Sequence, residues 1–240
     1  MTESRARTHP VLSLVMPAYN EEGAIAAVVR EWDAELQRVG VPYEMRIYDD
    51  GSRDRTGEIL DTLAAAHPNV RPIHQSNRGH GPTLLRGYAE AAGDWVLQVD
   101  SDGEMAAAAF PTLWARREGT DLVLGYRQGR TSPLARRLIT GVSRLTVRML
   151  FGAGVRDVNC PYRLFRRDAL ARLLPTVPAD AFAPNVILAG LAVRAGLRVV
   201  ELPVPHTNRR TGASSIVRWK LWRAAFQSFT QTVRVAVRAR

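Results

Sequence analysis

The stretch WVLQVDSDGE (95–104) places three carboxylates, Asp100, Asp102 and Glu104, directly after a short apolar run. The apolar run has no helical periodicity and has the length of a buried parallel strand. Carboxylates this close together repel one another, so a cation or solvent must relieve the repulsion. We therefore interpret the segment as a buried strand followed by a loop that is either a divalent-cation site or a solvated acidic turn.

Four other apolar runs of similar length alternate along the chain with segments of helical pattern. We expect strands over 11–16, 43–48, 70–75, 95–99 and 121–125. The first helix is expected to run to about residue 38, with Asn20 as its N-cap and Glu21 and Glu22 in its first turn, where the helix dipole favours acids. Five alternations of strand and helix predict an α/β fold with a mostly parallel sheet and helices on both faces.

Polar loops follow these strands, and in such sheets ligands bind at the carboxyl ends of the strands. The loops are PAYNEE (17–22), DDGS (49–52), NRGHG (77–81) and DSDGE (100–104). Carboxylates two residues apart on an extended segment point to the same side, which suits Mg²⁺ or Mn²⁺ bound together with a diphosphate. An aspartate after the second strand can accept from a ribose hydroxyl or a base N–H, and glycines allow close backbone approach. Each loop taken alone is equally compatible with an ordinary turn.

Composition sets broad limits on the other function classes. The 240 residues are 46% hydrophobic, which suits one large domain or one domain with an appendage. The net charge of +10 fits nucleic acid, an anionic membrane or phosphorylated substrates, although Lys220 is the only lysine and the arginine content indicates a biased composition. The single cysteine, Cys160, excludes an internal disulfide and fits a reducing compartment. No uncharged apolar run of membrane-spanning length occurs, and residues 1–10 contain no apolar signal core.

Together the four loops resemble, in order and spacing, those of the family-two glycosyltransferases, which have the GT-A fold. DVNCPYRLFRRDAL (157–170) is similar to a segment of polyprenyl-phosphate sugar transferases, and ELPVPHTNRRTGASS (201–215) to their R-x-x-G-x-S element. The resemblance spans roughly residues 11–215 and is nearest to the dolichol-phosphate mannose synthases and their bacterial relatives. It implies a catalytic domain over 1–214, followed by a basic amphipathic helix within 215–240.

The resemblance also implies roles for individual residues. A nucleotide pocket would be lined by Pro17, Tyr19, Glu21, Asp50 and Gly79, with Asp50 at the base or ribose. Asp102 would ligate Mg²⁺ or Mn²⁺, Asp100 would lie near the ribose or the metal, and Glu104 stands where relatives often carry a glutamine ligand. Phosphates of the donor or the acceptor would meet Arg127, in the loop after the fifth strand, and Arg136 and Thr140, on the next helix. Arg209 and Ser214 would close over the diphosphate from the far side.

Three positions depart from the family pattern. His80 and Ser215 stand where relatives often have lysine, and CPY (160–162) replaces a small residue, glycine and an aromatic residue. A different phosphate clamp would account for the first two departures, and so would the near absence of lysine from the chain. The third bears on the identity of the acceptor.

The acceptor class follows from the acids late in the catalytic domain. Relatives that glycosylate hydroxyls usually carry an acidic pair there, whereas Asp157, Asp168, Asp180 and Glu201 are isolated acids. A hydroxyl acceptor needs a general base, whereas a phosphate acceptor is already an anion. Asp157 is the best candidate for a base, and the alternative is an aspartate that orders an arginine.

These observations predict a metal-dependent, inverting transfer of a sugar from GDP-mannose or a UDP-hexose to a polyprenyl or dolichyl phosphate. One alternative is transfer to a lipid or saccharide hydroxyl, and another is a non-catalytic protein that binds nucleotide sugars. Nucleic-acid binding is disfavoured, because the acidic loops crowd the expected cleft and the basic residues match no DNA-binding motif.

The C-terminal segment 215–236 has the pattern of one helix. An apolar stripe at steps of three and four is formed by Trp219, Trp222, Phe226, Phe229 and Val233, with basic residues off the stripe. Such a helix can lie in a membrane interface. Alternatively, it packs on the catalytic domain or on a partner subunit, which would be a membrane protein or a second copy of this chain. Residues 133–151 form a second amphipathic segment. With a lipid acceptor, the expectation is a peripheral protein at the cytoplasmic face of a membrane.

Overall fold

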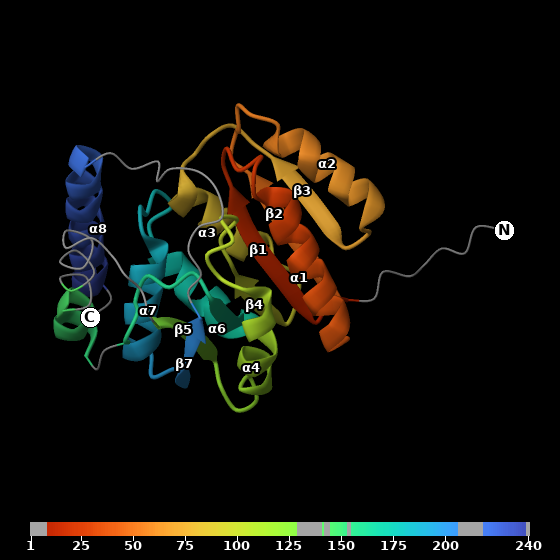
Figure 1. Ribbon diagram of the computed structural model, residues 1–240. Helices are drawn as coiled ribbons and strands as arrows, with labels where there is room; N and C mark the ends of the chain where they lie inside the picture. Colours follow the sequence, from red (N-terminus) through yellow and green to blue (C-terminus); the bar gives the residue numbers. More distant parts are fainter. Residues whose placement is uncertain (1–8, 129–140, 142–144, 153–154, 206–217, 239–240) are drawn as a thin grey trace.

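A computed structural model describes residues 9–128, 141, 145–152, 155–205 and 218–238, and its centre is one seven-stranded sheet (Figure 1). The strands are β1 Leu12–Ala18, β2 Tyr43–Asp49, β3 Val70–His74, β4 Trp95–Gln98, β5 Leu122–Gln128, β6 Arg163–Arg166 and β7 Val199–Pro205. Their order across the sheet is β3-β2-β1-β4-β6-β5-β7. Strand β6 is antiparallel to both of its neighbours, and the other pairings are parallel. The expected α/β class with a mostly parallel sheet is confirmed.

Helices cover both faces of the sheet, because the strands are apolar on both sides. The helices are α1 Ile25–Val39, α2 Thr56–Ala66, α3 His80–Glu90, α4 Phe110–Ala115, α6 Arg167–Leu173, α7 Pro184–Arg194 and α8 Arg218–Arg238, with short 3₁₀ turns at Ala107–Ala109 and Leu174–Thr176. In β1, Leu12, Leu14 and Met16 join the core under α1, α2 and α4, whereas Val15 joins the core under α3, α6 and α7. This alternation along one strand separates the two cores.

Three local expectations are corrected. Asn20 does not cap the first helix, which begins at Ile25; Asn20 adopts a left-handed conformation, with φ of 54°, in the preceding turn. Glu21 and Glu22 therefore lie before the helix rather than in its first turn. Arg127 lies inside strand β5 rather than in the loop after it, because β5 pairs in parallel with β7 as far as residue 128.

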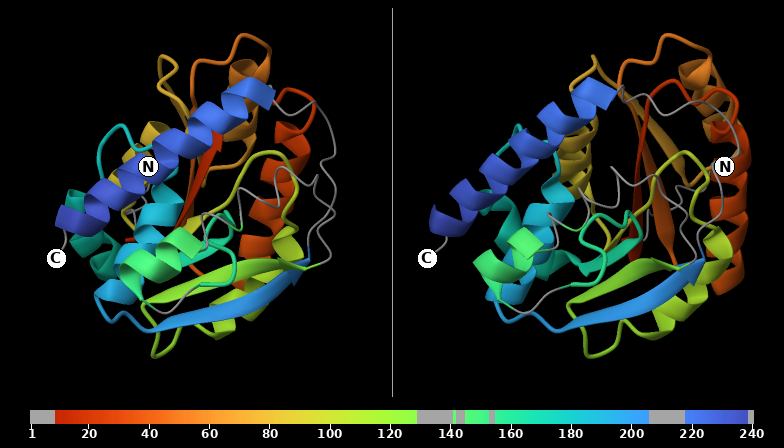
Figure 2. Two further views of the ribbon diagram at one scale, coloured as in Figure 1. Left: turned by 90° about the vertical axis from the view of Figure 1, so that its left-hand side faces the viewer. Right: turned by 60° about the vertical axis from the view of Figure 1, so that its left-hand side comes forward.

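The C-terminal helix is described over Arg218–Arg238 and packs on α7, as Figure 2 shows, and its expected start at residue 215 lies outside the described residues. Among residues 226–238 of this helix, Gln231, Thr232, Val235 and Ala236 are buried, whereas Phe226 and Phe229 of the expected apolar stripe are exposed. The side chains of Trp219 and Trp222 lie outside the described part of the structure. The domain boundary expected at 214/215 lies outside the described residues. Within the described parts of the chain, none of the helices combines the length and apolar content that crossing a bilayer requires.

A buried arginine joins strand β6 to the second half of the fold. Arg163 is fully buried and donates to the backbone carbonyls of Val158, Cys160 and Asn185. Burial lowers the pKa of Arg163, because the interior disfavours the charged form. This side chain fixes the loop before β6 against the first turn of α7.

Replacing Arg163 with methionine is expected to lower the free energy of unfolding by about 3 kcal/mol, because the buried carbonyls lose their donors. Urea unfolding followed by circular dichroism measures the change. Arg172→Met, on exposed helix surface, is the matched control and should have little effect. Equal stability of the two variants would show that the buried guanidinium is dispensable.

Candidate functional site

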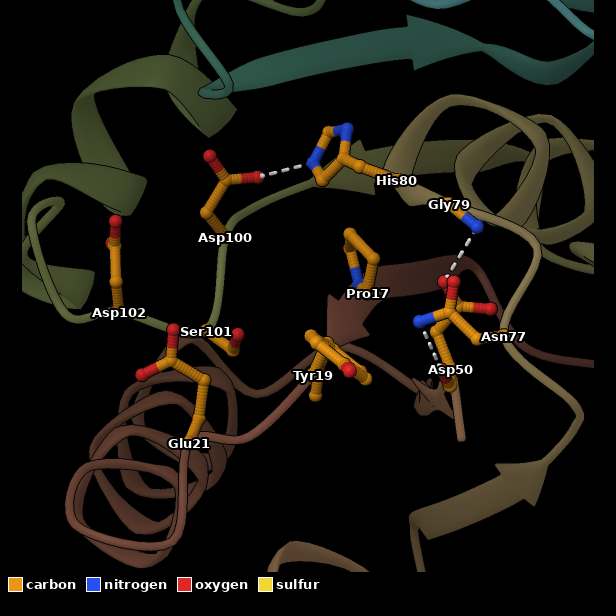
Figure 3. Close-up of a pocket in the computed structure, with 11 residues that line it drawn as sticks. Pro17, Tyr19, Glu21, Asp50, Asn77, Gly79, His80, Asp100, Ser101 and Asp102 are labelled. Carbon is orange, nitrogen blue, oxygen red and sulfur yellow. Dashed lines mark hydrogen bonds and ion pairs between the residues drawn. The ribbon is translucent and has the colours of Figure 1, made fainter. Parts of the chain in front are cut away.

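A cavity of about 350 Å³ lies at the carboxyl ends of β1, β2 and β4, beside the start of α3 (Figure 3). We call it the first cavity. Its lining is Pro17, Ala18, Tyr19, Glu21, Asp50, Asn77, Gly79, His80, Asp100, Ser101 and Asp102. All of the residues predicted for the nucleotide pocket, together with Asp100 and Asp102, therefore meet at one place. Glu104 follows on the same loop and is not part of the lining.

Asp50 organises the glycine loop on one side of the first cavity. One carboxylate oxygen accepts from Gln75 Nε2 at 2.7 Å and from the backbone N–H of Arg78 at 2.8 Å, and the other accepts from the N–H of Gly79 at 2.8 Å. Asn77 Nδ2 donates to the Asp50 carbonyl at 2.9 Å. A carboxylate has about four acceptor positions, so Asp50 can hold this loop and still accept from a ligand.

The loops after β1 and β2 hold one another in place on the other side. The N–H of Asn20 donates to Ser52 Oγ at 3.0 Å, and the N–H of Glu21 donates to Thr56 Oγ1 at 2.8 Å. The N–H of Arg53 donates to Asn20 Oδ1 at 2.8 Å. These bonds explain the unusual backbone at Asn20, and they fix Tyr19 and Glu21 at the cavity. The sequence DDGSRDRT thus acts partly as a scaffold for PAYNEE.

A histidine faces the acidic loop. His80 Nε2 lies 3.4 Å from Asp100 Oδ1, and Figure 3 shows the two side chains pointing toward one another. Partial desolvation favours the neutral imidazole, but Asp100, with Asp50 and Asp102 beyond it, raises the pKa of His80. The position where relatives often have lysine therefore still carries a basic group directed at the carboxylates.

A buried polar network lies beneath Asp100, and the sequence analysis missed it. Gln98 Nε2 donates to Asp100 Oδ1 at 3.3 Å, and Gln98 Oε1 accepts from Asn185 Nδ2 at 2.9 Å and from the Tyr88 hydroxyl at 3.1 Å. Gln98 is fully buried. The glutamine within the otherwise apolar run WVLQV could have indicated this network, because a polar side chain in a buried strand requires hydrogen-bond partners.

The donor set fits a divalent cation of the magnesium type. Asp102 and Glu21 both border the first cavity, and Asp102 Oδ1 also accepts from the N–H of Glu104 at 3.0 Å. Mg²⁺ is commonly held by one or two carboxylates together with substrate phosphates. In the described parts of the chain, no group of three or more His, Cys, Asp or Glu side chains has the arrangement of a metal site. A bound diphosphate and water are the ligands that usually complete such a site.

Arg127 and Asp157 form a separate, mostly buried ion pair. Arg127 Nε lies 2.8 Å from one Asp157 carboxylate oxygen, and a terminal guanidinium nitrogen lies 3.0 Å from the other. Burial by itself would raise the pKa of Asp157, but the hydrogen bonds and charge of Arg127 outweigh it, so the pKa is lowered. This is the geometry of an aspartate that orders an arginine, and a lowered pKa makes the carboxylate a weak base. Arg136, Thr140, Arg209 and Ser214 lie outside the described residues.

Comparisons with known proteins agree with this geometry. The family model described as glycosyl transferase family 2 matches residues 13–174. The undecaprenyl-phosphate 4-deoxy-4-formamido-L-arabinose transferase of Pseudomonas fluorescens is 30% identical over 229 residues, covering 93% of this chain and 66% of that protein. The protein of the same name from Pectobacterium atrosepticum is 30% identical over 214 residues, covering 88% of this chain and 64% of that protein. The chain thus spans slightly less than two thirds of these relatives.

Solved structures show the same fold. Glucosyl-3-phosphoglycerate synthase from Mycobacterium tuberculosis, in complex with Mn²⁺, UDP and phosphoglyceric acid, superimposes with a TM-score of 0.70 at 21% identity. The similarity covers 95% of this chain and 78% of that one. The same enzyme with Mn²⁺, UDP and glucosyl-3-phosphoglycerate gives a TM-score of 0.69 at 22% identity, with 95% and 80% coverage. The fold expected from the motifs is confirmed.

Proposed function

Because the chain belongs to glycosyl transferase family 2, we propose that it transfers a sugar from a nucleotide diphosphate sugar to a polyprenyl phosphate at a membrane surface. The observation that carries the proposal is the first cavity, where the glycine loop held by Asp50 faces the acidic loop with Asp102. Relatives named as undecaprenyl-phosphate sugar transferases support the acceptor class. Neighbouring structures with UDP and Mn²⁺ support a UDP-hexose donor, and GDP-mannose remains the second candidate.

In the proposed mechanism, the nucleotide lies between Tyr19 and the Asp50 loop. Asp102, with Glu21 across the cavity, would hold the Mg²⁺ or Mn²⁺ ion, with Asp100 at the ribose. When bound, such an ion neutralises the charge that develops on a leaving diphosphate. His80, whose raised pKa favours the charged form relative to a free histidine, lies beside the same loop, where fixed groups act on the transition state without reorganisation.

The transfer itself needs no proton acceptor. An oxygen of the acceptor phosphate attacks the anomeric carbon from the face opposite the diphosphate, which gives inversion. The bond between that carbon and the diphosphate oxygen breaks, and its electron pair leaves with the nucleoside diphosphate. Asp157, the best candidate for a base, is tied to Arg127 and has a lowered pKa. A phosphate acceptor therefore suits this chain better than a hydroxyl, whose proton would have to be removed.

Two surface segments support the membrane part of the proposal. Helical residues 145–151 and the C-terminal part of α8 are both tied to Arg194, which donates to the carbonyls of Leu150 and Ala236. Together these segments carry most of the exposed large apolar side chains in the described part of the chain: Leu145, Met149, Phe226, Phe229 and Val237. Exposed arginines accompany them, as expected for a surface that meets anionic lipid headgroups.

The proposed function predicts an organic-extractable product that is labile to mild acid when the enzyme receives a radiolabelled nucleotide sugar, Mn²⁺ and a polyprenyl phosphate. A panel of GDP- and UDP-sugars identifies the donor, and the Asp102→Ala variant controls for contaminating activity. Label found only on hydroxyl acceptors would favour the second enzymatic alternative. Nucleotide-sugar binding without transfer to either acceptor class would favour a non-catalytic binding protein.

A further inference from the structure

A second cavity, of about 480 Å³, adjoins the first and shares Gly79, His80 and Asp100 with it. It lies between the start of α3, the loop before β6, the start of α7 and α8. Its volume falls in the range of about 300–1,000 Å³ typical of small-molecule sites. No step of the mechanism above uses the far side of this cavity.

The two ends of the second cavity differ in chemistry. At the shared end stand His80 and Arg78, and the Arg78 guanidinium has no ion pair or side-chain hydrogen bond with the described residues. Away from that end, Pro161, Phe182 and Pro184 supply an apolar wall, and the polar side chains of Asn159, Asp180 and Gln227 border the cavity around it. Phe182 is 42% exposed, so its apolar side chain is open to a ligand in this cavity. A ligand with an anionic head and an apolar body matches both ends.

Helix α8 controls the position of this apolar wall. The Gln231 side chain accepts from the N–H of Phe182 at 2.9 Å through Oε1, and donates through Nε2 to the Asp180 carbonyl at 3.2 Å. These two bonds clamp the loop that carries Phe182 onto α8. Gln227, one turn earlier on α8, borders the cavity, and Phe226 beside it is exposed. Apolar surface therefore continues from the cavity onto the helix.

We propose that the second cavity binds the first isoprene units of the acceptor, an assignment that depends on the proposed acceptor class. The acceptor phosphate lies at the shared end near Arg78 and His80, next to the anomeric carbon of a donor in the first cavity. The first isoprene units pack against Phe182, Pro161 and Pro184. The rest of the polyprenyl chain leaves along the exposed face of α8 toward the membrane.

Steady-state kinetics with geranyl phosphate, a soluble ten-carbon acceptor that needs no membrane, test this assignment. Phe182→Asp is expected to raise the KM for geranyl phosphate at least tenfold and to change the KM for the donor less than twofold. Phe182→Leu keeps an apolar side chain and should stay within about threefold of the wild type, because it retains most of the buried apolar area. Thermal unfolding of both variants checks that the loop change leaves the fold intact.

Substitutions on the membrane-facing surface provide the matched control. Met149→Asp and Leu145→Asp replace exposed residues that do not line the second cavity and do not belong to α8. They should leave the KM for geranyl phosphate unchanged and reduce binding to vesicles that contain phosphatidylglycerol.

The outcomes separate this assignment from the proposed function. An unchanged KM for geranyl phosphate in Phe182→Asp, with a wild-type enzyme that turns it over, would overturn the cavity assignment alone. A wild-type enzyme that transfers sugar to no polyprenyl phosphate of any length would overturn the proposed function, and the cavity assignment with it. An equal rise in the KM values for donor and acceptor would indicate a general defect and would also refute the assignment.

Discussion

Asp102→Ala is expected to lower kcat/KM by about 10²- to 10³-fold, the usual loss when one group that stabilises developing transition-state charge is removed. Asp102 lies on the acidic loop and borders the first cavity. Both its position there and the family resemblance favour it as the metal ligand. Without it, Glu21 and Asp100 would be the carboxylates that remain beside that part of the cavity. The loss should appear both in turnover and in Mn²⁺-dependent nucleotide binding.

Two measurements isolate the effect. Calorimetric titration of UDP or GDP, with Mn²⁺ and then with a chelator, should show metal-dependent binding in the wild type and none in Asp102→Ala. Asp168→Asn, at an exposed position on α6, removes a carboxylate of the same type far from the cavity and should match the wild type. Retained Mn²⁺-dependent binding in Asp102→Ala would show that the metal ligand lies elsewhere, whatever the change in rate.

The sequence predicted the parallel part of the sheet well, because buried parallel strands are short apolar runs and the connecting helices have their own period. It did not predict β6. That strand has four residues, RLFR, and its antiparallel place between β4 and β5 depends on pairings between residues far apart in the chain, such as Trp95 with Arg166 and Leu122 with Phe165. Arg163 at its start is a charged residue whose burial depends on two carbonyls of the preceding loop and one on α7, and the local sequence pattern does not predict these contacts.

The candidate site divides in the same way. Residues on loops at the ends of predicted strands could be placed at one edge of the sheet from topology alone, and the first cavity contains them. Contacts between loops could not be predicted, since they depend on side-chain directions. Asp50 was expected only to meet the ligand, yet it also holds the glycine loop. The second cavity is built from the starts of α3 and α7 and from α8, which are distant in sequence and share no motif.

The pair of Arg127 and Asp157 gives the second large effect. Asp157→Asn is expected to lower the free energy of unfolding at pH 7 by about 3 kcal/mol, because it leaves a mostly buried guanidinium without its counter-charge. Activity should fall by about tenfold, or ~1.4 kcal/mol, because the amide offers one acceptor oxygen where the carboxylate accepts two bonds from Arg127. The guanidinium of Arg127, which the family resemblance implies would meet a phosphate, is then no longer held in one orientation.

The pH dependence distinguishes this ion pair from simple loss of packing. The pKa of Asp157 is lower in the folded protein than in the unfolded chain, where it is about 3.9. The Asp157 carboxylate therefore stabilises the fold fully at pH values well above 3.9, and this stabilisation is lost as the pH falls through the pKa of the folded state. The stability difference between wild type and Asp157→Asn should therefore be constant between about pH 7 and 5 and shrink below about pH 5. Urea unfolding from pH 7 to 3.5 measures it, with Glu58→Gln at the exposed Arg55–Glu58 pair as a control expected to show no change. A difference that stays constant down to the lowest pH would mean that packing, rather than charge, makes Asp157 important.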